Sequence, residues 1–149
     1  DNCEKGCPSH ENSCAYLSLI GEIFAKNPEA NAVFLSMPAA TMGFAVANKL
    51  MDARLIPESY IMLKDVVRLP YAALENCSQI AGTLSKKSPA VVIDNECAIT
   101  IGKNATKAFD RMEVLDYSAR SVLLANSVAK IRPISQKEVD EIDAVFNGW

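Results

Sequence analysis

The sequence predicts an α/β fold in which helices cover a mixed, mainly antiparallel central sheet. Short apolar runs rich in β-branched residues alternate along the chain with segments of helical periodicity. Two of these runs are joined by a short polar connection, which is typical of an antiparallel hairpin. With 149 residues, we expect a single domain over 1–149 that can bury a sizeable core.

The strands are expected where apolar runs are short and bounded by turn residues. They are 32–35, 66–69, 90–93 and 98–101, with the hairpin formed by the last two. The helices are expected where apolar residues recur every three to four positions. They are 14–26, 39–51, 77–84, 105–128 and 136–146, and 55–63 is ambiguous, with Pro57 suited to open a short helix.

Polar residues suited to helix ends support these bounds. We expect Ser13, Asn76 and Asn104 to cap helix starts, and Ser135 with Glu138 to form a capping box. Gly148 would end the last helix, and residues 1–13 are expected to be irregular. The apolar face of the first helix is predicted at Leu17, Ile20, Ile23 and Phe24, and that of the long helix at Ala108, Met112, Leu115, Ala119, Val122 and Ala129.

Composition excludes several classes of partner. The net charge is −3, and basic residues form no cluster beyond Lys86 and Lys87, so neither nucleic acid nor an anionic membrane is an expected partner. No apolar run reaches the roughly 18 residues that span a bilayer. Five cysteines, an odd number, and no secretory segment favour a reduced, cytoplasmic protein. Since the chain does not begin with Met, we expect it to come from a longer gene product.

The strand–turn–helix segment 32–46 is the part of the sequence that bears most on function. Ligands of α/β folds bind at the carboxyl ends of strands. Here that end carries Leu35 and Met37, where an enzyme would usually place polar groups. The sequence therefore predicts a strand end in the right place for a site but with apolar side chains.

Five segments in order resemble the class II aldolase/adducin family of metal-dependent sugar-phosphate aldolases and epimerases and the non-enzymatic adducin head. Pro8–Glu11 is similar to the family's Pro-Ser-Ser-Glu, and 27–33 to the approach to its His-x-His strand. The segment 92–102 is similar to its strand–Asn-His-Gly–strand hairpin, and the pieces 69–71 and 105–109 also match in order. The resemblance implies a layered α/β domain that lacks the family's N-terminal part.

The resemblance places the family's three metal-binding histidines at Leu35, Met37 and Glu96. Leucine has no donor atom, methionine sulfur is a soft ligand, and one carboxylate cannot replace the three protein ligands of catalytic zinc. We therefore expect no cofactor and a scaffold or binding role. The alternative is a lyase of the metal-dependent sugar-phosphate aldolase type, or an epimerase, with a rearranged zinc site. Glu96 could also be an ordinary solvated turn residue.

Further roles follow only from the resemblance. The catalytic acid/base falls on Glu11, although the spacing from Glu11 to Leu35 is longer than in the family, and phosphate contacts fall on Ser9 and His10. A catalytic tyrosine corresponds to Tyr60, with Tyr71 as the alternative. The family also implies a homo-oligomer, typically a tetramer, and a small phosphorylated sugar as ligand.

The first residues carry a separate candidate for metal binding. Cys3, Cys7, His10 and Cys14 offer soft or borderline ligands within a short segment, as a structural zinc knuckle needs, but the spacing is not that of a usual knuckle. A Cys–His nucleophilic pair is a second interpretation. Incidental cysteines are a third. A metal-binding regulatory module built on these residues is the corresponding functional hypothesis.

Overall fold

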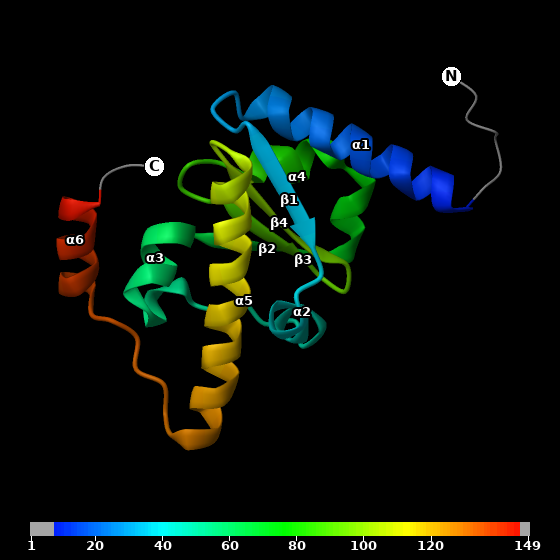
Figure 1. Ribbon diagram of the computed structural model, residues 1–149. Helices are drawn as coiled ribbons and strands as arrows, with labels where there is room; N and C mark the ends of the chain where they lie inside the picture. The colour runs from blue at the N-terminus through cyan, green and yellow to red at the C-terminus, as the bar shows by residue number, and fades with distance from the viewer. Residues whose placement is uncertain (1–7, 147–149) are drawn as a thin grey trace.

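The computed structural model describes residues 8–146, with side chains described from Tyr16 onward. Its centre is a four-stranded sheet in the order β1-β4-β3-β2 (Figure 1). The strands are β1 (Ala32–Ser36), β2 (Val66–Leu69), β3 (Ala90–Ile93) and β4 (Cys97–Gly102). β4 pairs antiparallel with both β1 and β3, while β2 and β3 are parallel. The predicted mixed α/β fold and the hairpin are confirmed.

Helices cover both faces of the sheet (Figure 1). One face carries α1 (Pro8–Lys26) and α4 (Cys77–Thr83). The other carries α2 (Ala39–Val46), α3 (Pro57–Leu63) and the long α5 (Ala105–Val128), and α6 (Gln136–Val145) lies beside α3. Two 3-10 helices, η1 (Ala53–Leu55) and η2 (Tyr71–Glu75), connect these elements. No helix among residues 8–146 is long and apolar enough to cross a membrane.

The core has two halves because side chains alternate across the pleat of each strand. In β3, Val91 and Ile93 pack toward α1 and α4, whereas Ala90 and Val92 pack toward α2 and α5. All four side chains of β3 are buried, as expected for a strand covered on both faces. Full burial of a side chain such as Val91 contributes about 1.5–3 kcal/mol to folding.

The first helix differs from its prediction. α1 already includes Pro8, the first described residue, well before residue 14, and proline is tolerated in the first turn of a helix. Ser13 therefore lies inside the helix and does not cap it. The buried face also shifts, since Leu17 is 68% exposed and Phe24 39% exposed while Leu19 is buried with Ile23.

The helix after β1 ends earlier than predicted, at Val46 instead of residue 51. Asn48 has a φ of 54°, a left-handed conformation that asparagine tolerates and that stops a helix. The N–H of Lys49 then donates to the carbonyl of Phe44 at 2.9 Å, which closes the last turn.

The later helices follow the prediction closely. Asn104 accepts a hydrogen bond from the N–H of Lys107 at 2.8 Å, and Ser135 and Glu138 form the capping box. The predicted stripe of α5 is buried except for Ala129, which lies beyond the helix and is exposed. Asn76 caps α4 and Pro57 opens α3, also as predicted. Gly148 lies outside the described residues.

Candidate functional site

The turn between β3 and β4 lies at the carboxyl end of β3, where α/β folds place their ligands. It consists of Asp94, Asn95 and Glu96. Asn95 takes the left-handed conformation, with a φ of 56°, and the N–H of Glu96 donates to the carbonyl of Ile93 at 3.2 Å. This geometry reverses the chain within three residues and fixes the direction of the two carboxylates.

An ion pair fixes the first carboxylate of the turn. Asp94 is only 6% exposed and accepts two hydrogen bonds from Arg68 of β2, from Nε at 2.5 Å and from Nη2 at 2.6 Å. Nη2 also donates to Oδ1 of Asn48 at 2.7 Å. A two-pronged pair of this kind is strongly directional, so Arg68 holds the turn against the end of β2.

The second carboxylate, Glu96, is half-buried and accepts a hydrogen bond from the phenol of Tyr16 on α1. The hydrogen bond to Glu96, followed by burial and by the negative charge of Glu96, raises the pKa of Tyr16 well above its ordinary value. The cause is that the phenol can donate only while it keeps its proton. Tyr16 therefore joins α1 to the hairpin turn.

A cavity of about 330 Å³ opens beside this pair. Glu75 and Tyr71 from η2 line it together with Tyr16 and Glu96, and the half-buried Cys77 forms part of its wall. Two carboxylates and two phenols can accept and donate hydrogen bonds to a ligand rich in hydroxyl groups. These four side chains are also the groups that could carry acid–base chemistry here.

The three positions at which the resemblance predicts metal ligands lie at this same end of the sheet. Leu35 pairs with Ile99 in β4 and packs into the core half that contains α1 and α4, while Met37 follows β1 and is 69% exposed. Glu96 is bound by Tyr16. Within the described side chains, no group of three His, Cys, Asp or Glu residues could hold a metal ion. Leu35 has no donor atom and Met37 offers only a soft thioether sulfur.

The remaining predicted site residues are only partly placed. Ser9, His10 and Glu11 lie in the first turns of α1, and their side chains, like that of Cys14, are outside the described part of the structure. Cys3 and Cys7 also lie outside the described residues. Their predicted roles stay predictions.

Tyr60 is not brought together with Glu96. It lies on α3, on the other side of the sheet, where its phenol donates to Oδ2 of Asp143 at 2.8 Å and its ring contacts the Lys64 ammonium. Burial and the Asp143 carboxylate raise the pKa of Tyr60 to about 12. Tyr71, the alternative in the sequence, is the tyrosine that lines the cavity with Glu96. The catalytic role of Tyr60 stays a prediction.

The structure adds two residues that the sequence prediction missed, Tyr16 and Arg68. Tyr16 precedes Leu19 and Ile23 at helical spacing, so the same periodicity could have placed it on the buried face. Arg68 interrupts an otherwise apolar strand, and a charge in such a run is a signal for a buried partner. Its partner Asp94 had no signal beyond its position in the turn.

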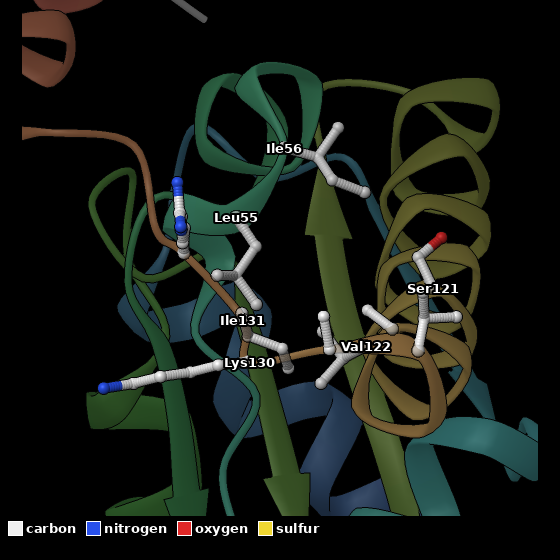
Figure 2. A pocket seen from close by; sticks show the side chains of 10 residues that line it. Leu55, Ile56, Ser121, Val122, Lys130 and Ile131 are labelled. Carbon is white, nitrogen blue, oxygen red and sulfur yellow. The ribbon is translucent and has the colours of Figure 1, made fainter.

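A second cavity, of about 520 Å³, lies between η1 and the carboxyl end of α5. Figure 2 shows Leu55, Val122 and Ile131 around it, with the Lys130 side chain directed away from its centre. Its walls are almost wholly apolar, so this cavity offers little with which to orient a reacting group. The site beside Glu96 is the stronger candidate for chemistry.

Comparison with protein families shows which family this chain belongs to. Residues 9–123 match the model of the class II aldolase and adducin N-terminal domain. The chain belongs to this family. No curated protein sequence matches the chain.

Solved structures of family members share the fold. L-fuculose 1-phosphate aldolase from Glaciozyma antarctica PI12 is 20% identical, with a TM-score of 0.71 over 86% of this chain and 49% of its own. An aldolase II superfamily protein from Pseudomonas syringae is 14% identical, with a TM-score of 0.72 over 90% of this chain and 55% of its own. L-fuculose-1-phosphate aldolase from Thermus thermophilus is 22% identical, with a TM-score of 0.60 over 73% of this chain and 60% of its own. The chain thus spans about half to three fifths of these proteins.

Proposed function

We propose that this chain is a divergent family member that performs no zinc-dependent aldol chemistry and acts as a scaffold or binding domain. The observation that carries the proposal is the pair Leu35 and Met37 at the end of β1, where the resemblance predicts two histidine ligands. The whole sequence holds a single histidine, His10, so this chain cannot supply a three-histidine site. Glu96 at the third position is already bound by Tyr16.

The chemistry of zinc explains why these residues matter. A catalytic zinc takes three protein ligands and keeps one position open for substrate. When bound, it polarises the substrate carbonyl and stabilises the enediolate that carbon–carbon cleavage produces. Leu35 offers no donor atom and Met37 only a soft thioether, so the chain has no comparable means of holding that metal at β1.

We propose that the chain binds a small hydroxyl-rich ligand in the cavity beside Glu96. The lining of the 330 Å³ cavity includes Glu75 and Glu96 but no Lys or Arg among the described residues, so it suits the hydroxyl groups of a sugar and not a phosphate. The resemblance assigns phosphate contacts to Ser9 and His10. A phosphorylated sugar would therefore place its hydroxyl groups against Glu96 and its phosphate toward the start of α1.

A direct assay tests the absence of aldolase activity. L-fuculose 1-phosphate, the substrate in the names of two structural relatives, would be incubated with the chain and zinc, and product aldehyde measured. We expect no cleavage above the rate without protein. Metal-dependent cleavage that is abolished by a chelator and by Glu96→Gln would overturn the proposal.

Restoring the ligands tests the three assigned positions. The triple variant Leu35→His, Met37→His, Glu96→His should bind one zinc ion per chain, measured by titration calorimetry. The matched control replaces Leu35→His by Phe34→His, because Phe34 packs toward the opposite side of the sheet. A folded triple variant that binds zinc no better than the control would show that the three positions do not converge.

The alternative function is a sugar-phosphate aldolase or epimerase with a rearranged site. The cavity beside Glu96 supports it, because Tyr16, Tyr71 and Glu96 are acid–base groups that line this cavity together. In that case Glu11 and His10 would complete the site with Glu96, and zinc would be its cofactor. Turnover that is lost in both Glu11→Gln and Glu96→Gln would favour this alternative over the binding role.

The family resemblance also supports a proposal on assembly, and the cysteines support one on location. We propose a homo-oligomer, typically a tetramer in this family, located in the cytoplasm. Cys77 and Cys97, the two cysteines among the described side chains, are free thiols, and burial raises the pKa of Cys97 to about 12. A single monomeric species in size-exclusion chromatography with light scattering would contradict the assembly.

A further inference from the structure

A cavity of about 640 Å³ lies on the α5 side of the sheet, at the amino ends of β2 and β3. It is bounded by α3 and the residues after it, by the loop before β3, by the first turns of α5 and by α6. In Figure 1, α6 stands next to α3, on the side of α3 away from α5. Glu96 lies at the opposite end of β3, so the two cavities are separated by the length of the strand.

Five cationic side chains and two carboxylates line this cavity, in a chain whose net charge is −3. The cations are Lys64, Lys86, Lys87, Lys107 and Arg111. They come from three separate segments of the sequence, which the fold brings together: the end of α3, the loop before β3 and the start of α5. Like charges gathered this way raise the local positive potential and attract a multiply charged anion.

The pairing of these cations leaves positive charge facing the cavity. Lys64 pairs with Asp143 at 2.5 Å, and Lys86 pairs with Glu29, which lies outside the cavity lining. Among the described residues, the side-chain partner of Lys107 is the Met62 sulfur, at 3.8 Å. Within the described part of the chain, the Lys87 ammonium makes no hydrogen bond or ion pair. Lys87 and Lys107 are therefore available to a ligand.

Arg111 forms the buried wall of the same cavity. It is 6% exposed, and its Nε and Nη1 donate to the carbonyls of Met62 at 3.1 Å and Ile101 at 2.5 Å. These contacts fix the guanidinium, so its charge stays in place behind the lysines. The apolar atoms of Ile61 and Phe146 complete the lining.

We propose that this cavity is a binding site for a small phosphate-bearing anion, held by Lys87 and Lys107 in front of Arg111. Lysine ammonium groups act as compact point charges and commonly bind phosphate. The Arg111 guanidinium donates from Nε and Nη1 to backbone carbonyls, so it cannot offer those two groups to a planar carboxylate. A cavity of about 640 Å³ is also of the size that holds a small ligand. The inference does not depend on the function proposed for the cavity beside Glu96.

The test is titration calorimetry of the full chain with inorganic pyrophosphate, and with citrate as a carboxylate anion of similar charge. We expect pyrophosphate to bind more tightly than citrate and to weaken as ionic strength rises. The variant Lys87→Gln with Lys107→Gln should lose affinity for pyrophosphate by about tenfold or more. Both side chains reach solvent, so the variant should fold, which circular dichroism checks.

The matched control is Lys49→Gln with Lys137→Gln, which removes the same charge from exposed lysines outside the cavity lining. It should keep its affinity for pyrophosphate within about twofold, because distant exposed charges are screened. The proposal is overturned if pyrophosphate fails to bind, if citrate binds more tightly, or if both double variants lose affinity equally.

Discussion

The two ends of β3 differ in how their charged groups are used. At the carboxyl end, Asp94 and Glu96 are each bound by a side chain of this chain, Arg68 and Tyr16. At the amino end, cations outnumber carboxylates around the cavity and Lys87 has no side-chain partner among the described residues. Removing one partner of a buried charge pair costs stability because the other charge stays buried, whereas unpaired cations in a cavity destabilise the fold slightly and attract ligands.

The largest effect should come from breaking the buried pair at the carboxyl end. Arg68→Ala leaves the Asp94 carboxylate buried without its partner, so we expect unfolding to become easier by about 3 kcal/mol, measured by urea denaturation. The control Arg54→Ala breaks an exposed pair with Asp52 and should change stability far less, because solvent screens that pair. Equal losses in the two variants would show that the turn is not held by Arg68.

A smaller loss should follow from Tyr16→Phe, which removes the hydrogen bond to Glu96 and keeps the ring. We expect a destabilisation of about 1 kcal/mol at neutral pH. The Tyr16 contribution should be present below the ordinary tyrosine pKa of about 10 and disappear as pH rises through the higher pKa of the folded state. Urea denaturation of both proteins across alkaline pH would show it, and a difference that grew with pH would contradict it.

The ion pair between Lys64 and Asp143, at the cavity of about 640 Å³, should lose its contribution to stability in acid. Lys64, followed by the Tyr60 phenol, lowers the pKa of Asp143 below its ordinary value. The contribution of Asp143 is therefore present above the ordinary aspartate pKa and lost as pH falls through the lower pKa of the folded state. The stability of Asp143→Asn should fall less in acid than that of the original chain. The measurement is the melting temperature of both proteins as pH falls. An equal decrease in the two proteins would show that contacts other than Asp143 hold α6.

The smallest effect should come from the amino end. Lys87→Gln removes a cation that has no partner among the described residues and lies among like charges, so stability should be unchanged or rise by less than about 0.5 kcal/mol. The measurement is urea denaturation at low ionic strength, where repulsion is strongest. A loss comparable to that of Arg68→Ala would mean that the two ends do not differ in this way.

Most of the fold could be predicted from the sequence, because strand burial and helix capping depend on residues that are close together along the chain. The run 90–93 is apolar because both faces of β3 are covered, and Asn104 caps α5 through a contact three residues away. The predictions failed at two helix bounds. α1 already includes Pro8, well ahead of its predicted start, and the left-handed Asn48 ends α2 early.

The candidate site was predicted only in outline. Leu35 and Glu96 were assigned through the resemblance, and the register of β1 and β4 places them at one end of the sheet. Their surroundings depend on partners distant in sequence, since Tyr16 and Glu96 are 80 residues apart and Arg68 and Asp94 are 26 apart. No spacing rule connects such residues, because the connection is made by packing of α1 and β2 against the hairpin.

Zinc stoichiometry tests the central claim most directly. The chain and its Glu96→Gln variant would be saturated with zinc, freed of excess metal and measured for zinc per chain. We predict equal zinc content in the two proteins, because any ion held by Cys3, Cys7, His10 or Cys14 does not depend on Glu96. One zinc ion per chain that is lost in Glu96→Gln would show that the end of β1 still forms a metal site, and would contradict the account.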